Sequence, residues 1–541
     1  MELFQPIDWI VIALYFLVIA GIAYWSMRKQ KNSARDYFLA DRNIGWFIVG
    51  TSILASNVGS EHVVGLSGTA AKSGLVFGHY ELHSWIVLLL GWVFVPFYMR
   101  SKVFTMPEFL EKRYNANARW FLSVISLLSY ILTKVSVTVY AGAVVIATFM
   151  GFDFWTSALV LVILTGIYTV IGGMRAVAYT EAMQAIVLLL GSVILTILGL
   201  SELGGWDALL AATPKEQLNM FRPLSDPEFP WAGILFASPI VGIWYWCTDQ
   251  YIVQRCLAAR NEQEARRGTI FAAYLKLFPF FIFMIPGLIA TAMAASGKLV
   301  LTEADQAFPQ LVKTLLPSGL KGLIAGGLLA ALMSSLASVF NSCSTLFTMD
   351  IYRKLQPEAN DKKLVQVGRM ATTIVVVLGI LWIPVMSGIS GVLYQYLQSV
   401  QSYLAPPIAA VFLLGLFSKR INSYGALTAL VGGFLLGALR IFLELNKGSL
   451  TGFWYDFATL NFLYFCIALF IFCILVLIGV SLATGKPNEE QLNGLTFATT
   501  LPEDQAKSRS SWNTTDVILS AFVLVFILIV LIYFSPLGVA G

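Results

Sequence analysis

The stretch Ala55-Ser56-Asn57-Val58-Gly59-Ser60-Glu61-His62 decides the fold, because it interrupts an apolar segment that is long enough to cross a bilayer. Asn, Ser and Gly loosen a helical hydrogen-bond ladder, and Glu and His are costly in hydrocarbon. Unwound backbone at membrane depth persists only where protein or a water-filled cavity satisfies its carbonyl groups. The stretch therefore favours a broken helix that binds a small cation, and the alternative is a packing face with one buried polar pair.

The composition indicates a membrane protein. The 541 residues are 58% hydrophobic and 12% charged, and the mean hydropathy is +0.77. Soluble domains of this size are less apolar, so the sequence predicts an all-α polytopic membrane protein. Counting apolar runs of about 20 residues gives about fourteen transmembrane helices.

The distribution of Lys and Arg predicts the orientation of the chain. One set of alternate loops holds about 25 of these residues and the other set about 7, so the first set is assigned to the cytoplasm by the positive-inside rule. We expect a multi-pass protein of the plasma (inner) membrane with both termini external. The net charge of +5 reflects this topology, and no basic aromatic patch indicates nucleic-acid binding.

A second interrupted helix opens the second half of the chain, at Trp244-Tyr245-Trp246-Cys247-Thr248-Asp249-Gln250. Two interrupted leading helices in corresponding positions indicate an inverted repeat with a binding site between its halves. Five parts are expected: a peripheral first span with a cytoplasmic loop (1–43), the first repeat (44–203), an external loop (204–230), the second repeat (231–418), and C-terminal scaffold spans with a cytoplasmic linker (419–541).

Several polar residues lie inside other apolar runs. Glu81 and Ser84 are three residues apart, which predicts that they share a helix face. Lys134 and Lys276 each fall in the middle of a span, where a lone charge is costly, and the expected partner of Lys134 is a backbone carbonyl or a carboxylate. Hydroxyl groups recur from Ser334 to Ser338, a pattern that by itself is typical of close helix packing.

Seven segments, spread along nearly the whole chain, carry a resemblance to a known family: Asp36-Tyr37-Phe38-Leu39-Ala40, Ala55-Ser56-Asn57, Tyr168-Thr169-Val170-Ile171-Gly172-Gly173, Gln250-Tyr251-Ile252-Val253-Gln254-Arg255, Ser334-Ser335-Leu336-Ala337-Ser338, Thr345-Leu346-Phe347-Thr348-Met349-Asp350-Ile351-Tyr352 and Ala405-Pro406-Pro407-Ile408-Ala409-Ala410-Val411-Phe412-Leu413-Leu414. In these segments the chain resembles the sodium/solute symporter family, and within it the sodium–glucose (sodium–galactose) cotransporters. The resemblance implies a LeuT-type five-plus-five inverted repeat with broken leading helices, which works by alternating access.

The resemblance also implies a sodium site and its ligands. The expected ligands are neutral oxygens, from the backbone of Ala55, Val58 and Ala331 and from the hydroxyl groups of Ser334 and Ser335. Sodium is a hard cation, and neutral oxygens can replace its hydration shell and still release it. Glu181, near the inner mouth of its span, is a candidate for the sodium exit path.

The resemblance further implies a set of substrate contacts and gates. The expected sugar contacts offer a carboxylate, an ammonium, two amides, a hydroxyl and an imidazole to sugar hydroxyls, and they are Asn57, His62, Glu81, Ser84, Lys276 and Gln398. Aromatic lining is expected from Tyr245, which matches the inner gate, and from Trp246. The outer gate matches Leu66, Tyr80 and Tyr394. His62, Leu82 and Gly242 occupy positions where some relatives carry other residues, so the preferred sugar stays open.

The predicted function is sodium-coupled secondary active symport of a neutral hexose of the glucose or galactose type. One sodium per sugar is expected, because Ala337 stands where relatives with a second sodium carry a hydroxyl residue. A symporter of myo-inositol or another polyol is the alternative, and a transporter-derived sensor or an intramembrane enzyme is more remote. No HExxH or GxSxG motif occurs, so no enzymatic activity is expected. The expected partners are the sugar, sodium and the bilayer, and the oligomeric state stays open.

Overall fold

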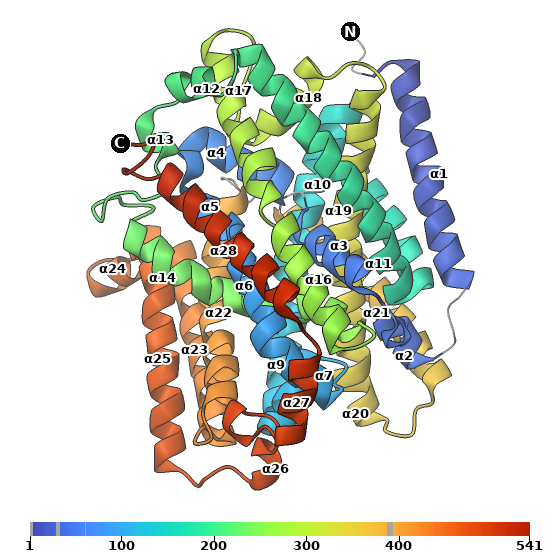
Figure 1. Cartoon of the computed structure of the whole chain (residues 1–541), viewed down its shortest axis with the longest axis vertical. Helices are drawn as coiled ribbons and strands as arrows, with labels where there is room; N and C mark the ends of the chain where they lie inside the picture. The colour runs from blue at the N-terminus through green and yellow to red at the C-terminus, as the bar shows by residue number, and fades with distance from the viewer. Residues whose placement is uncertain (1–3, 29–32, 60, 387–392) are drawn as a thin grey trace.

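The computed structural model describes residues 4–28, 33–59, 61–386 and 393–541 (Figure 1). The described residues form helices and loops, with one isolated β-bridge between Ile44 and Ala259. Twelve helices of this described part are long and apolar enough to cross a membrane, and Trp46–Asn57 and Phe154–Ile167 are shorter apolar helices. The predicted all-α membrane class is confirmed, and these helices agree with the expected number of about fourteen.

The first leading helix is broken where the sequence predicts it. Helix α3 (Trp46–Asn57) ends at Asn57, and Val58 is extended, with φ −81° and ψ 100°. The chain resumes as the π-helical turn η2 (Glu61–Leu66) and helix α4 (Ser67–Ser73). The N–H of Val58 still donates to the carbonyl of Leu54 at 2.7 Å, and the helical hydrogen-bond ladder of α3 ends there.

The second leading helix is interrupted in the corresponding place. Helix α14 (Trp231–Gly242) continues as the π-helical turn η6 (Ile243–Thr248), and α15 (Gln250–Leu257) begins after Asp249. Asp249 has extended backbone, with φ −79° and ψ 128°, and its carboxylate accepts a hydrogen bond from the backbone N–H of Tyr251. This carboxylate caps the N-terminus of α15, an arrangement that the helix dipole favours.

The other spans of the two halves surround these broken helices. In the first half they are formed by α5 (Gly78–Glu81), α6 (Ser84–Leu89) and α7 (Val95–Ser101), by α9 (Ala116–Ser129), η5 (Tyr130–Val135) and α10 (Ser136–Met150), and by α11 (Phe154–Leu203). In the second half they are α16 (Glu262–Leu275), η7 (Phe280–Met284) and α17 (Ile285–Ala295), α19 (Leu320–Leu346), α21 (Asp361–Met386) and α22 (Leu393–Phe417). Helix α11 is kinked at Gly173, whose φ of 57° suits glycine.

Helix α19 carries the predicted serine ligands and is anchored by the first span, α1 (Pro6–Arg28). The carboxylate of Asp8 accepts hydrogen bonds from the backbone N–H of Gly319 (2.6 Å) and of Gly322 (2.9 Å). A carboxylate at a helix N-terminus satisfies amides that have no partner within the helix. Through Asp8 the first span therefore fixes the N-terminal end of α19.

The C-terminal spans are α23 (Ser423–Leu445), α25 (Phe462–Ala483) and α28 (Thr514–Tyr533), and the short helix α27 (Pro502–Ser510) lies in the linker before α28. The backbone N–H of Met220, in the loop 204–230, donates to the carbonyl of Phe534 at 2.9 Å. Asp8 near the start of the chain lies beside Gly319. Both ends of the chain thus lie beside loops poor in Lys and Arg, and Figure 1 shows both in its upper half.

Candidate functional site

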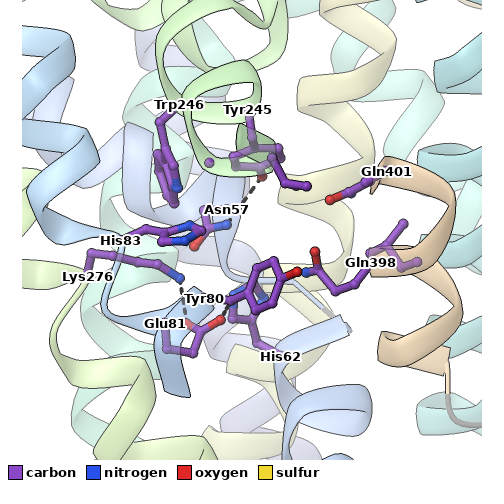
Figure 2. Close-up of a pocket in the computed structure, with 13 residues that line it drawn as sticks. Asn57, His62, Tyr80, Glu81, His83, Tyr245, Trp246, Lys276, Gln398 and Gln401 are labelled. Carbon is purple, nitrogen blue, oxygen red and sulfur yellow. Dashed lines mark hydrogen bonds and ion pairs between the residues drawn. The ribbon is translucent and has the colours of Figure 1, made fainter. Parts of the chain in front are cut away.

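A cavity lies at the break of the first leading helix (Figure 2). Its wall is built by the end of α3, by η2, by the end of α5 and the turn after it, by the end of α14 and by η6, by the residue after α16, and by α22. The lining residues are Asn57, His62, Tyr80, Glu81, His83, Val241, Gly242, Tyr245, Trp246, Lys276, Leu397, Gln398 and Gln401. Because it touches both halves and both interrupted helices, the cavity occupies the central position that the sequence predicts.

A buried ion pair crosses one side of this central cavity. The Nζ atom of Lys276 donates to Oε2 of Glu81 at 2.5 Å, and Figure 2 shows the two side chains pointing toward each other. His62 Nε2 lies 3.5 Å from the other carboxylate oxygen, Oε1 of Glu81. All three side chains are nearly inaccessible to solvent. The pair compensates two charges that would each be costly alone at this depth, and it leaves the wall close to neutral.

Another part of the cavity wall combines amides with aromatic rings. Asn57 Nδ2 donates to the hydroxyl group of Tyr245 at 3.3 Å, and the Tyr245 and Trp246 rings meet edge to face at 5.1 Å. Asn57 Oδ1, His83 Nε2 and Gln398 Oε1 are buried and have no hydrogen-bond partner within the described part of the chain. A buried polar atom without a partner is costly, so these atoms suit a ligand rich in hydroxyl groups.

The structure brings most of the predicted substrate residues together. Seven of them line the central cavity: Asn57, His62, Glu81, Tyr245, Trp246, Lys276 and Gln398. Tyr80 of the predicted gates also lines it, whereas Leu66 is buried away from the wall. The side chain of Tyr394, the remaining gate residue, lies outside the described residues.

Ser84 does not line the cavity, although its spacing from Glu81 predicts a shared helix face. The reason is local, because α5 ends at Glu81, Leu82 and His83 form a turn, and α6 begins at Ser84. Spacing of three residues places side chains on one face only within a continuous helix. The turn presents His83 to the cavity instead. Gln401 was also missed, and its position one turn after Gln398 could have identified it.

A second, smaller cavity lies beside the break and contains four of the five predicted sodium ligands. Its lining includes Ala55 and Val58 from the end of α3 and Ala331 and Ser334 from α19. Ser335 is next to Ser334 on the same helix and is buried. The hydroxyl oxygens of Ser334 and Ser335 have no hydrogen-bond partner among the described residues. Two such hydroxyls beside the end of a broken helix fit a small cation, because sodium binds neutral oxygens.

Glu181 lies in a polar cluster one helical turn from these serines, and this cluster joins four helices. Its carboxylate accepts hydrogen bonds from the hydroxyl groups of Ser52 and Ser338, and Arg255 Nη2 donates to it at 3.0 Å. Both side chains of the Arg255–Glu181 pair are fully buried. The acid is therefore paired here, between α3, α11, α15 and α19.

Lys134, whose partner was open between a carbonyl and a carboxylate, pairs with the carboxylate of Asp249. The Nζ–Oδ2 distance is 2.6 Å, and the hydroxyl group of Tyr130 donates to the same carboxylate. Tyr251, two residues after Asp249, donates its hydroxyl hydrogen to the carbonyl of Ser56. The interruption of the second leading helix is thus linked both to η5 and to the break of the first.

Comparisons with known proteins agree with this geometry. The profile of the sodium:solute symporter family matches residues 37–433. Sodium/glucose cotransporter 1 of Oryctolagus cuniculus is 40% identical over 523 residues, which cover 88% of this chain and 78% of the relative. The sodium/myo-inositol cotransporter of Homo sapiens is 37% identical over 541 residues, which cover 91% of this chain and 75% of the relative.

One solved structure reproduces the arrangement of the helices. A Na⁺-coupled sialic acid symporter in a substrate-bound, outward-open state superposes with a TM-score of 0.75 at 22% identity, over 89% of this chain and 99% of that chain. At this identity the likeness shows the fold, which is the LeuT-type fold with broken leading helices that the resemblance implied. Because the family profile covers most of its length and relatives are about 40% identical along it, the chain belongs to the sodium:solute symporter family.

Proposed function

We propose that this protein imports a neutral hexose of the glucose or galactose type together with sodium, by alternating access. Coupling is supported most directly by the positions of the two cavities, because both border the break of the first leading helix. Asn57 lines the central cavity, while Ala55 and Val58 line the smaller one. An ion held by the carbonyls of this break orders the backbone that presents Asn57 to the sugar. Each ligand then favours the backbone conformation that the other needs, which is the thermodynamic basis of coupling.

The chemistry of the central cavity supports a neutral, polyhydroxylated substrate. Its charges are compensated by the Glu81–Lys276 pair, so a charged substrate has no unpaired partner in this wall. Asn57 and Gln398 supply amide groups, Ser84 completes the proposed contacts from outside the lining, and Trp246 supplies an aromatic surface. Similarity to sodium/glucose cotransporter 1 supports a hexose in particular. A polyol is the second candidate, because the human sodium/myo-inositol cotransporter is nearly as similar.

The proposal assigns sodium to the smaller cavity. Its ligands are the carbonyls of Ala55, Val58 and Ala331 and the hydroxyls of Ser334 and Ser335, and Glu181 lies on the exit path. The unpartnered serine hydroxyls support this assignment. Tyr245 closes the inner side of the sugar site, and Leu66, Tyr80 and Tyr394 close the outer side.

We also propose a cellular location for the protein and a division of its chain into repeats. The protein spans the plasma (inner) membrane with both termini external, and it acts as a transporter without enzymatic activity. The positive-inside rule supports this orientation, as do the contacts of both chain ends with loops poor in Lys and Arg. Residues 44–203 and 231–418 form the two repeats, and residues 1–43, 204–230 and 419–541 flank or connect them.

Uptake by purified protein in proteoliposomes tests the proposal. An inward sodium gradient should drive uphill accumulation of labelled glucose or galactose with an accompanying current, and sialic acid should not be taken up. Myo-inositol in the same panel distinguishes the polyol alternative. Uptake that proceeds equally well without sodium, on a proton gradient, would contradict sodium coupling.

A further inference from the structure

A cavity larger than the central one lies among the loops rich in Lys and Arg. Its wall is formed by α2 (Ala34–Leu39) with the adjoining turn η1 (Ala40–Arg42), by the end of α7, by the connection between α15 and α16, and by α27. Six cationic side chains line it: Arg35, Arg42, Arg100, Lys102, Arg260 and Lys507. Four segments far apart in the sequence thus converge on one strongly positive cavity, which we call the basic cavity.

The acids of the basic cavity do not balance these cations. The lining acids are Glu262 and Asp504. Glu262 Oε1 already accepts hydrogen bonds from Arg266 Nη2 at 2.7 Å and from the Ser508 hydroxyl at 2.6 Å. Asp504 lies 3.6 Å from Arg100 Nη1. Arg35 Nε also lies 3.5 Å from Oδ1 of Asp41, which is outside the lining. With two acids against six cations in the lining, and Glu262 engaged by a cation that does not line the cavity, the wall keeps an excess of positive charge.

The backbone of this wall is held in an uncommon conformation. In the described part of the chain, the non-glycine residues with positive φ are Ala40, Asp41, Arg42 and Lys102, and the last two line the basic cavity. Arg42 Nη2 donates to the carbonyls of Lys102 (2.8 Å) and Val103 (2.9 Å), which ties the two strained segments together. Such residues are uncommon, persist only where their surroundings fix them, and cluster at ligand sites.

The cations of the wall also repel one another. Burial, and then the like charge of Arg35, lower the pKa of Arg42 below its ordinary value. Arg42, Lys102 and Arg260 come from three different segments, so their convergence is a feature of the tertiary structure. An anion in the cavity would relieve this repulsion, and the N-terminus of the 14-residue helix α16, capped by Asn261, adds a favourable dipole.

We propose that the basic cavity binds a phosphate-bearing anion. Guanidinium groups match phosphate oxygens with two parallel hydrogen bonds, and lysines add point charges. Basic pockets on the cytoplasmic side of membrane proteins take anionic lipid headgroups by this chemistry, and a soluble polyphosphate offers the same oxygens. Helix α16 begins at this cavity and ends at Leu275, just before Lys276 of the central cavity, while α27 is docked on it through Glu262 and Ser508. The bound anion therefore holds the linker against the helix that carries a substrate residue.

Binding to the full-length protein in nanodiscs tests the proposal. One arm compares phosphatidylcholine discs with discs that also contain phosphatidylglycerol, and the other titrates inorganic tripolyphosphate into phosphatidylcholine discs. The readouts are the thermal midpoint and the apparent affinity. Lys102→Gln/Lys507→Gln removes two exposed cations of the cavity, and Lys362→Gln/Lys363→Gln is the matched control at two exposed lysines elsewhere. We expect the first variant to bind roughly tenfold or more weakly and the control to bind like the unmodified protein.

The outcomes distinguish a lipid headgroup from a soluble anion as the ligand, or they show that the basic cavity binds neither. Stabilisation by phosphatidylglycerol alone identifies a lipid headgroup, stabilisation by tripolyphosphate alone identifies a soluble anion, and a response to both identifies a general phosphate site. If Lys102→Gln/Lys507→Gln does not purify as a single species, the variant Arg35→Gln/Arg260→Gln is tested in its place. No stabilisation of the unmodified protein by either probe, or equal binding by the cavity and control variants, would overturn the proposal. None of these readouts requires transport, so they stand apart from the uptake assay.

Discussion

Lys134 and Asp249 form a buried ion pair, with 2.6 Å between Nζ and Oδ2, at the interruption of the second leading helix. Only 8% of Lys134 and 4% of Asp249 is exposed. The lysine Nζ also lies 4.0 Å from the centre of the Tyr251 ring and 4.7 Å from that of Tyr245, which lines the central cavity. The pair therefore fixes the interrupted backbone from which Tyr245, the proposed inner gate residue, projects.

Replacing Asp249 by Asn should destabilise the protein strongly. The substitution leaves the Lys134 charge buried without its counter-charge, and breaking a buried pair in this way typically costs about 3–5 kcal/mol. We expect a clearly lower thermal midpoint of the purified protein in detergent, measured by intrinsic fluorescence.

The double variant Lys134→Met/Asp249→Asn is the control for this prediction. Removing both charges also removes the need to compensate either, so the double variant should be more stable than Asp249→Asn alone. If the single variant melts like the unmodified protein, or the double variant melts below the single one, the pair does not hold the break.

Glu81→Ala should weaken the apparent affinity for sugar by roughly tenfold or more, because a hydrogen bond to a charged group is typically worth about 1.5–3 kcal/mol. Sodium-driven uptake at varied sugar concentration measures this change. Glu202→Ala is the matched control, since Glu202 is an exposed acid paired with Lys298 outside the cavity. An unchanged affinity in well-folded Glu81→Ala protein would assign Glu81 a structural role.

The fold and the position of the site were predictable from polarity inside apolar runs. Asn57 and Asp249 are residues that a continuous membrane helix disfavours, and the structure breaks both leading helices next to them. The local pattern could not show the turn between Glu81 and Ser84, because both flanking segments are helical and apolar. The helix-face argument therefore placed Ser84 beside Glu81, in line with the sugar contact that the resemblance implied, while the turn directs His83 into the cavity.

The sequence could not predict which buried charged residues pair with each other across the chain. Lys134 is 115 residues from Asp249, and the positive charge predicted only that some compensating group must exist. Glu181 illustrates the same point, because its partners Ser52, Ser338 and Arg255 come from three other helices. Only the packed structure selects among the many polar residues that could satisfy a buried charge.

Ser335→Ala should weaken the dependence of uptake on sodium more than it lowers protein abundance. The Ser335 hydroxyl is buried and has no partner among the described residues, so its loss removes a candidate ligand and leaves no internal hydrogen bond broken. Ser344→Ala on the same helix is the control, because its hydroxyl already donates to the carbonyl of Gly368 at 2.7 Å. Uptake measured at varied sodium concentration should shift for Ser335→Ala only. Equal sodium dependence in both variants would remove Ser335 from the site.

Ala337 should limit the protein to one sodium per sugar. It is fully buried and immediately precedes Ser338, whose hydroxyl donates to Glu181, but it offers no side-chain oxygen to a second ion. A potential of 100 mV contributes about 2.3 kcal/mol for each charge moved, so the number of sodium ions sets the concentrating power. Reversal potentials in proteoliposomes should therefore give a slope for one sodium, and a slope for two would refute this prediction. Ala337→Thr should raise the ratio, whereas Ala337→Val, which has the same shape without the hydroxyl, should not. If both variants change the ratio equally, the added volume rather than the oxygen controls coupling.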